Sequence, residues 1–259
     1  MAQIIAIANQ KGGTGKTTSA LNLGAALKEM RISGFIDAMD PQASLTLALG
    51  LNPDELEISI YTALKKVVED GQASPQEVII ATKEGLDLMP SNIELSQADL
   101  DLVREPLGVY ALRDLLASVE DTYDYILVDC PPSLGILTTN ALAAADQVII
   151  PLQADYLALK GVNLLLRSIA KIQRRANRRL RIAGVLLTMA DLRTLHAREI
   201  IASTREAFRD RIPVFKTVVK MSVRLKEAPI SGQSILTYAD KTVGATAYRE
   251  LAAEIAQEV

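Results

Sequence analysis

The sequence predicts an α/β protein in which a mostly parallel, twisted β-sheet is covered by helices on both faces. Short runs rich in β-branched residues alternate with longer segments of helical period, which is the pattern of repeated βαβ units. The short runs are almost continuously apolar, as expected for strands buried on both faces. No internal repeat, low-complexity tract or Pro/Gly/Ser linker divides the chain, so residues 1–259 are expected to form a single domain.

Seven strands are expected, each a run of four to six mainly apolar residues. In chain order they are Ile4–Ala8, Gly34–Asp37, Leu86–Met89, Tyr125–Asp129, Gln147–Pro151, Ile182–Leu187 and Val214–Thr217. Seven helices are expected because apolar residues recur every three to four positions between these strands and after the last. They are Thr17–Met30, Ile60–Val68, Tyr110–Ser118, Thr138–Ala144, Ala158–Arg175, His196–Arg209 and Val243–Ala256.

The composition excludes several classes of protein. With 49% hydrophobic and 23% charged residues, the chain resembles an ordinary globular protein that can bury a core. The single Cys130 excludes a disulfide framework or a Cys-based metal site within one chain, and the single His196 argues against a His-based metal site or a Ser-His-Asp triad. No signal-like N-terminus or long apolar run is present, so we expect a cytoplasmic protein.

A glycine-rich segment directly follows the first expected strand and leads into the first expected helix. It reads Asn-Gln-Lys-Gly-Gly-Thr-Gly-Lys-Thr-Thr from Asn9 to Thr18. Glycines let the backbone turn its N–H groups toward phosphate oxygens, and the helix adds its positive N-terminal dipole. Lys16 is placed to neutralise the β- and γ-phosphates of a nucleotide, and the Thr17 hydroxyl to bind Mg²⁺. The predicted phosphate site consists of Gly12, Gly13, Thr14, Gly15, Lys16, Thr17 and Thr18.

The loop departs from the strict pattern G-x-x-x-x-G-K-[ST], because Gln10 stands where the first glycine is expected. A second lysine, Lys11, precedes the glycines instead. In this respect the loop resembles the deviant Walker A motif of the ParA/MinD group of P-loop ATPases. The resemblance implies a P-loop NTPase fold with ATP and Mg²⁺ as cofactors. It also makes Lys11 the signature lysine, which in relatives reaches across a dimer to the other subunit's nucleotide.

Three further stretches extend this resemblance over nearly the whole chain. Asp40-Pro41-Gln42 follows the second strand as in ParA proteins, and Tyr125–Ser133 is similar to their Walker B strand and switch. The stretch from Val214 to Tyr248 resembles the ParA C-terminal region. Because the P-loop begins almost at residue 1, the resemblance is to the short, chromosomal type of ParA without an N-terminal helix-turn-helix module.

Two aspartates follow expected strands and are candidates for the chemistry. Asp129 ends an apolar strand, so its carboxylate is expected at the edge of the sheet where open α/β folds bind ligands, and there it can hold Mg²⁺ through water. Asp40 lies 24 residues after Lys16 and matches the relatives' aspartate that orients or activates the attacking water. A strand-capping role for Asp129 and a turn-forming role for Asp40 before Pro41 are the alternatives.

The sequence departs from its relatives at position 38. They commonly read Asp-x-Asp-Pro-Gln, whereas this chain has Ala38 in place of the first aspartate and Asp37 one position earlier. Side chains alternate along a strand, so Asp37 is expected to point to the opposite face. A one-residue shift, a natural loss and a deliberate ATP-trapping change are the three explanations. The expected consequence is slow or impaired ATP hydrolysis with ATP and Mg²⁺ still bound.

The loop from Cys130 to Gly135 follows the magnesium aspartate, and its two prolines stiffen a segment suited to sensing the γ-phosphate. Cys130 itself is expected to be structural. Thr188-Met189 and Val218-Val219 are candidates for contact with adenine, Met189 above all, although apolar residues there could equally belong to the core.

Charge is distributed unevenly along the chain. The formal net charge is −3, yet the window Lys160–Lys226 contains 17 Lys and Arg against four acids, or +13, which leaves −16 for the remainder. Such a run is often a solvated helix face. The resemblance implies instead that the ATP dimer binds double-stranded DNA without sequence preference, through phosphates and with a steep salt dependence. Candidate contacts are Arg224, Lys216, Lys220 and Lys226.

These observations lead to one main functional hypothesis and two alternatives. The main one is a ParA-like partition ATPase that dimerises with ATP, coats DNA on the nucleoid and is released when a ParB-like adaptor stimulates hydrolysis, which moves a plasmid, chromosome or protein-assembly cargo. A MinD-like membrane-cycling regulator would need a basic amphipathic C-terminal helix, whereas Glu250 and Glu254 make this one acidic, so no stable membrane binding is expected. A P-loop enzyme that transfers phosphate to a metabolite or serves a redox cluster is the third class, which the single cysteine disfavours.

Overall fold

A computed structural model describes residues 1–209 and 211–257, and within the helix at 156–175 it leaves the side chains of residues 156–160 undescribed. Asp210 and the side chain of Lys160, both counted in the basic window, lie outside this part. In the described ranges, eight strands form one sheet in the order β3-β4-β2-β5-β1-β6-β7-β8. The strands are β1 (Gln3–Ile7), β2 (Gly34–Ala38), β3 (Ile80–Ala81), β4 (Asp87–Met89), β5 (Tyr125–Asp129), β6 (Gln147–Gln153), β7 (Arg181–Ala190) and β8 (Val214–Lys220).

The sheet is parallel except at one edge, where β3 pairs with β4 in the antiparallel direction. The α/β class with a mostly parallel sheet is thereby confirmed. Parallel pairing requires a crossover between successive strands, and the helices supply it. The central strand β1 lies between β5 and β6, so the chain that leaves β1 and the chain that leaves β5 emerge side by side at one edge.

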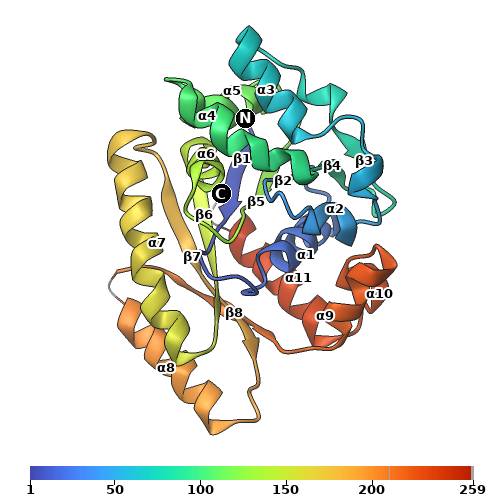
Figure 1. Cartoon of the computed structure of the whole chain (residues 1–259). Coiled ribbons are helices and arrows are strands. Elements are labelled where there is room, and N and C mark those ends of the chain that lie inside the picture. The colour runs from blue at the N-terminus through green and yellow to red at the C-terminus, as the bar shows by residue number, and fades with distance from the viewer. Residues whose placement is uncertain (210, 258–259) are drawn as a thin grey trace.

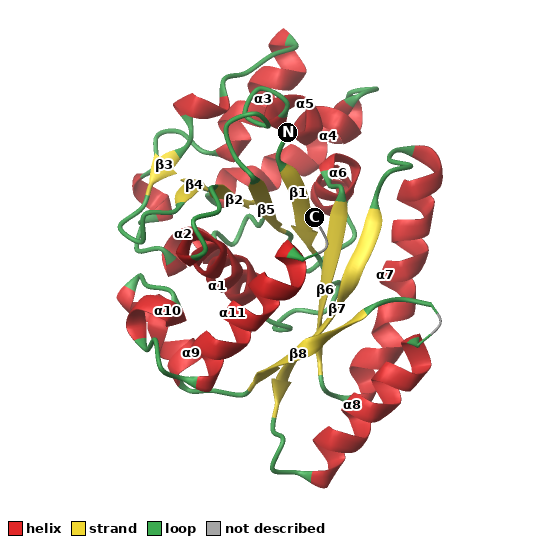
Figure 2. Ribbon diagram, turned by 180° about the vertical axis from the view of Figure 1, so that it is seen from behind, coloured by secondary structure: helices red, strands yellow, loops and turns green. Residues whose placement is uncertain are grey.

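Helices cover both faces of the sheet (Figures 1 and 2). One face carries α1 (Lys16–Glu29), α2 (Ser44–Ala48), α10 (Ile235–Tyr238) and α11 (Val243–Ala256), with α9 (Arg224–Glu227) beside them. The other carries α3 (Ile60–Asp70), α4 (Ala98–Arg104), α5 (Ala111–Leu116), α6 (Ile136–Ala144), α7 (Tyr156–Arg175) and α8 (Leu195–Phe208). We name these the α1 face and the α7 face.

Alternation along the strands explains why two separate cores form. Ile4 and Ala6 of β1 pack on the α7 face, whereas Ile5 and Ile7 pack on the α1 face, and all four side chains are buried. Both faces therefore need apolar residues, which is why the strands read as continuous apolar runs. Within the described residues, no helix is both long and apolar enough to span a bilayer.

The seven expected strands and seven expected helices are all present, with ends that differ by a few residues. Sequence patterns missed the two-residue β3 and the short helices α2, α4, α9 and α10. These elements are only four to seven residues long, apart from β3, and so contain too few turns to show a helical period.

Candidate nucleotide and magnesium site

The segment between β1 and α1 forms a compact loop whose backbone is held from several sides. The buried Asn9 side chain donates to the Pro151 carbonyl at 2.6 Å and accepts from the Lys11 amide at 3.1 Å. Thr188 at the end of β7 donates from its hydroxyl to the Thr14 carbonyl at 2.8 Å. Gly13 and Gly15 have φ values of 70° and 90°, a left-handed region that favours glycine. The loop is thus preorganised to direct backbone N–H groups at an anion.

The two lysines of the loop occupy different environments. Lys16 is buried at the first position of α1, and its ammonium donates to the Lys11 carbonyl at 3.2 Å, so it lies under the loop. Burial lowers the pKa of Lys16, while the nearby Asp129, Cys130 and Asp40 oppose this shift. Lys11 lies at the exposed rim, where its ammonium is 3.4 Å from Gln153 Oε1 and 3.9 Å from Asp155 Oδ2. The structure therefore separates an inward lysine from an outward one.

Asp129 ends β5 beside the loop, as the sequence predicted. Its carboxylate is fully buried, and neither oxygen has a hydrogen-bond partner among the described residues. The pKa of Asp129 is raised to about 7, mainly because the carboxylate is buried; the Thr17 hydroxyl and Lys16 lower it, and Asp40 adds to the rise. A buried carboxylate without a hydrogen-bond partner lowers the stability of the folded state unless a cation or a hydrogen-bond donor binds it.

Thr17 and Asp129 fit a magnesium ion. The hydroxyl lies close enough to Asp129 to lower the pKa of this carboxyl, and both groups offer the oxygen ligands that Mg²⁺ prefers. Across the described residues there is no cluster of three or more His, Cys, Asp or Glu side chains that could hold a metal. A site with few protein ligands is what Mg²⁺ uses when nucleotide phosphates and water complete its shell.

Ala38 lies on the nucleotide side of the sheet and Asp37 does not. Ala38 is the register partner of Asp129 and packs in the core of the α1 face. Asp37 pairs with Val128 and Met89, which belong to the core of the α7 face. The structure therefore argues against a one-residue shift that would make Asp37 the equivalent of the relatives' first aspartate. Asp37 is fully buried, and neither of its oxygens has a partner among the described residues.

Asp40 lies at the site, in the loop after β2. Its Oδ1 accepts from the Gln42 amide at 3.0 Å, and its carbonyl accepts from the Ser91 hydroxyl at 2.8 Å. Asp40 contributes to the electrostatic environment of both Lys16 and Asp129, so the structure brings these three predicted residues together. The turn-forming role also holds, because the carboxylate caps the turn at Pro41-Gln42 while it faces the site.

The loop after Asp129 lies against the phosphate loop. A Cβ atom on Gly12 would lie 3.9 Å from the Cβ of Pro132, so the two loops are neighbours. Cys130 is buried, and burial together with Asp129 raises the pKa of its thiol, which keeps it protonated and supports a structural role. The contact of Gly12 with Pro132 places the second loop beside the phosphate loop.

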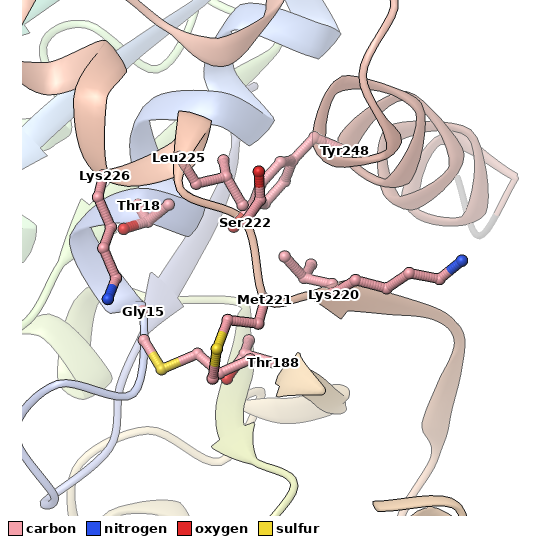
Figure 3. Close-up of a pocket in the computed structure, with 11 residues that line it drawn as sticks. Gly15, Thr18, Thr188, Lys220, Met221, Ser222, Leu225, Lys226 and Tyr248 are labelled. Atoms are coloured by element: carbon pink, nitrogen blue, oxygen red, sulfur yellow. The ribbon is translucent and has the colours of Figure 1, made fainter. Parts of the chain in front are cut away.

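A pocket next to the phosphate loop suits a nucleotide base (Figure 3). Gly15 and Thr18 form one wall, and Thr188, Met189 and Val219 line it from the ends of β7 and β8. Met189 has a φ of 54°, which turns the chain at this wall. Val218, a second expected adenine contact, instead packs against the core of the α7 face. The remaining lining residues are Lys220, Met221, Ser222, Leu225, Lys226 and Tyr248.

The basic window extends along the length of β7. Lys171 to Arg181 lie at the end of α7 and the start of β7, whereas Arg193 and Arg198 follow the other end of β7. These two ends are about 30 Å apart, because β7 is ten residues long. Lys216 lies between them, because β8 pairs with β7 from Val185 onward. The charges of the window are therefore spread along this side of the sheet rather than gathered at one end.

The four candidate DNA contacts also separate. Lys216 and Lys220 are exposed on the same face of edge strand β8, and Arg205 of α8 donates to the Lys216 carbonyl at 3.0 Å. Lys220 lines a surface groove together with Arg193 and Arg198, which sequence reasoning had not singled out. Arg224 pairs with Glu227 at 2.9 Å. Lys226 points toward Gly15 in the base pocket, whereas Lys220 extends away from it (Figure 3).

Sequence reasoning missed Asn9, Ser91 and Lys226 as parts of the nucleotide site. Asn9 carried a signal, because a buried polar residue directly after an apolar strand is expected to fasten the following loop. Ser91 and Lys226 carried none, since they are 51 and 210 residues from Asp40 and Lys16 in sequence. Only folding brings them to the site.

Comparison with known proteins supports the geometry. A family profile described as an AAA domain matches residues 2–182. The sporulation initiation inhibitor protein Soj of Bacillus subtilis is 43% identical over 99% of both chains, and the chromosome partitioning protein ParA of Caulobacter vibrioides is 38% identical over 98% of this chain and 93% of its own. A solved structure of cobyrinic acid a,c-diamide synthase from Mycobacterium smegmatis, with bound ATP analog and magnesium, has a TM-score of 0.87 at 36% identity and covers 100% of this chain and 96% of its own.

Proposed function

The chain belongs to the AAA-domain family of P-loop ATPases that includes the Soj and ParA proteins, and from this premise we propose that it is an ATP-dependent partition ATPase. It binds ATP and Mg²⁺, joins two subunits face to face and binds double-stranded DNA without sequence preference. A partner protein then stimulates hydrolysis and releases it. Full-length similarity to the chromosome partitioning protein ParA of Caulobacter vibrioides supports this function. The arrangement of Lys16, Asp129 and Asp40 around one loop carries it.

The residues of the site have separable roles in this cycle. The loop amides and Lys16 bind the phosphates, and the base pocket with Met189 positions the nucleoside. Thr17 and Asp129 would hold Mg²⁺, which supplies charge neutralisation on the β- and γ-phosphates when bound. Asp40 orients the attacking water, and the deprotonated carboxylate can accept its proton. Ala38 leaves one position of the site without a carboxylate, so hydrolysis is slow.

Lys11 joins the two subunits. Its side chain lies at the exposed rim of the loop, whereas Lys16 is buried beneath it. An exposed ammonium at the rim can reach the phosphates of a second subunit that faces this one. A nucleotide contacted by both subunits stabilises the dimer by its differential affinity for it.

DNA contact is assigned to the exposed basic residues of β8 and of the segment that follows β7. Lys216 and Lys220 share one face of β8, and Arg193 and Arg198 lie beside Lys220 in the groove. Their contacts are with phosphates, so affinity is uniform across sequences. Arg224 remains a candidate at the edge of this surface. The position of Lys226 in the base pocket favours a contact with nucleotide over one with DNA.

Two observations weigh against the alternatives. The apolar face of α11 is taken up by the core, since Ala245, Tyr248 and Leu251 are buried there, so this helix has no apolar face to offer a MinD-like membrane contact. The similar M. smegmatis protein carries the name of a diamide synthase, which is an enzyme of small-molecule chemistry. The ParA relative is 38% identical over almost its full length and carries the name of a chromosome partitioning protein, which favours partition instead.

The deciding experiment is DNA binding with and without ATP at several salt concentrations. ATP is expected to strengthen binding, and the affinity should fall linearly on a double logarithmic plot with a slope of about −0.9 per phosphate contacted. Binding that ignores ATP would refute the proposed cycle.

A further inference from the structure

Helix α4 and the turn after it present an apolar stripe on the surface. Leu100, Val103 and Leu107 are 63%, 67% and 69% exposed, while Ala98 and Leu102 on the inner side are buried in the core of the α7 face. Leu100 and Val103 are three positions apart on α4 and so are neighbours on its outer side, and Leu107 follows beyond the helix end. A single exposed apolar side chain needs no explanation, but three apolar side chains that lie next to one another on the surface indicate an interaction site.

A groove continues the stripe past Leu107. It is lined by Val67 and Val68 at the end of α3, by Pro106 and Leu107, and by Ala111 at the start of α5. The charged residues in its lining are the acidic Glu105 and Asp114, of which Asp114 is paired with Arg113 at 3.1 Å. We name Leu100, Val103, Leu107 and this groove the α4 surface (α4 lies in front of α3 and α5 in Figure 1).

The charge around the α4 surface is negative. Residues 93–105 contain Glu94, Asp99, Asp101 and Glu105 against the single Arg104. On the α3 side, Lys65 is already paired with Glu69 at 3.8 Å, and Asp101 accepts from the Tyr61 hydroxyl at 3.0 Å. An apolar stripe with an acidic border is complementary to a segment that is apolar on one side and basic on its flanks.

The α4 surface is linked to the Cys130–Gly135 loop, which the sequence predicts to sense the γ-phosphate. The fully buried Asn140 of α6 donates to the Gly108 carbonyl at 2.9 Å and accepts from the Leu112 amide at 3.0 Å. The same α6 begins directly after the Cys130–Gly135 loop. At the near end of α4, Asp99 Oδ1 is 3.6 Å from where a Cβ on Gly135 would lie. A movement of α4 or of the turn at Gly108 is therefore transmitted to this loop through packed and hydrogen-bonded groups.

We propose that the α4 surface is the docking site of a basic, amphipathic helical segment of a partner protein, and that docking acts on hydrolysis through Asn140 and α6. The inference deepens the proposed function, on which it rests, because it places the stimulating partner on the chain. A second copy of this chain is disfavoured as the occupant, since α4 against α4 would oppose Asp99, Asp101 and Glu105 to the same residues. The acidic border also repels DNA and anionic lipid.

Linkage makes the proposal sharper. If docking changes the affinity of the protein for ATP relative to ADP, then replacing ADP by ATP must change the affinity for the docked segment by the same factor. Binding measured with ADP and with a non-hydrolysable ATP analogue must therefore differ.

The probe is a designed helical peptide with leucines at i, i+4 and i+7 and lysines elsewhere, labelled for fluorescence anisotropy against the full chain. Leu100→Ser together with Val103→Ser is expected to weaken its binding at least tenfold. The matched control is Ile230→Ser, which removes an apolar side chain that is 86% exposed far from α4. This variant should bind the peptide with the same affinity as the parent. A glutamate-for-lysine peptide should not bind the parent. Equal affinity of the double variant and the parent overturns the proposal.

Two further readouts separate this proposal from the partition cycle. The double variant should keep ATP-dependent dimerisation and DNA binding, and if it loses the dimer, the stripe belongs to a subunit interface and the proposal is wrong. A fluorophore on Val103→Cys labels one site because Cys130 is buried, and its signal should change between ADP and the ATP analogue. If DNA binding by the parent ignores ATP while the peptide still binds at α4, the partition cycle fails and the docking site stands.

Discussion

Ala38 and Asp129 are register partners on the adjacent parallel strands β2 and β5, so the methyl group of Ala38 lies on the sheet face where Asp129 meets Lys16 and Thr17. The position where the resemblance to ParA proteins implies a carboxylate is thus beside Asp129, and here it is apolar. The neighbouring Asp37 does not replace it, because it points to the other face.

Ala38→Asp is expected to raise the rate of ATP hydrolysis by about tenfold or more, since a carboxylate placed beside the reacting phosphate adds positioning and proton transfer. Steady-state phosphate release with saturating ATP and Mg²⁺ measures this. Ala38→Asn, which has a similar size and no charge, is the control and should stay near the parent rate. Matching rates for the parent and Ala38→Asp would show that Ala38 does not limit turnover.

Asp37→Val is expected to stabilise the nucleotide-free protein by about 1–3 kcal/mol at neutral pH, because it removes a buried, unpartnered carboxyl. Burial, and secondarily Asp129, raises the pKa of Asp37 well above its usual 3.8. Above pH 3.8 the native state keeps a proton that the unfolded state releases, so the parent loses stability as pH rises toward the folded-state pKa. Urea unfolding at about pH 5 and about pH 8 should show a smaller difference for the variant.

The control for Asp37 is Asp37→Asn, which removes the titration but keeps a buried polar group. It should flatten the pH dependence as the valine does and gain less stability. Some slope is expected to remain in both variants, because the pKa of Asp129 is raised to about 7. An unchanged slope in both would mean that Asp37 does not titrate in this range.

Thr17→Ala and Asp129→Asn are each expected to abolish the strengthening of ATP binding by Mg²⁺, since each removes an oxygen that would hold the ion. Isothermal titration with and without Mg²⁺ measures the effect. Thr17→Ser keeps the hydroxyl and should behave like the parent. If the Mg²⁺ effect survives in Asp129→Asn, the buried carboxylate has another role.

Lys11→Ala is expected to remove ATP-dependent dimerisation while the monomer still binds ATP, because Lys11 lies at the exposed rim of the loop and Lys16 beneath it. Light scattering gives the mass with and without ATP, and a nucleotide titration gives the affinity. Lys16→Ala is the contrasting variant, and it should lose both ATP binding and ATP-dependent dimerisation. Equal ATP-induced mass shifts in parent and Lys11→Ala would contradict the assigned role.

Lys216→Ala with Lys220→Ala is expected to weaken DNA binding on every sequence and to reduce the magnitude of the salt slope by about two. The matched control is Arg174→Ala with Arg175→Ala, which removes two charges at the far end of α7, and should change the slope little. The Lys216 backbone amide, bonded to Glu254 at 2.8 Å, is untouched by the change. A larger effect from Arg174→Ala with Arg175→Ala would place the DNA-binding surface at the end of α7 instead of on β8.

The phosphate loop, Asp129, Asp40 and the long elements could be predicted because their signals are local. A strand of five apolar residues or a helix of fourteen shows its period within its own length, and the Asn9–Thr18 loop contains its own glycines and lysines. The short α4 could not be predicted, since it has fewer than two turns, and its exposed Leu100 and Val103 mimic buried positions. The base pocket draws Lys226 and Tyr248 from more than 200 residues away.

The sequence by itself determined the class of sheet, the order of strands and helices along the chain, and which residues are candidates to bind phosphate and metal. Only the tertiary structure decided that Ala38 rather than Asp37 shares a sheet face with Asp129, that Lys226 lines the pocket beside the phosphate loop, and that the basic window is spread along β7. The physical reason is that a sequence carries composition and local period, whereas faces and edges are set by strand register and by the roughly 30 Å that a ten-residue strand spans.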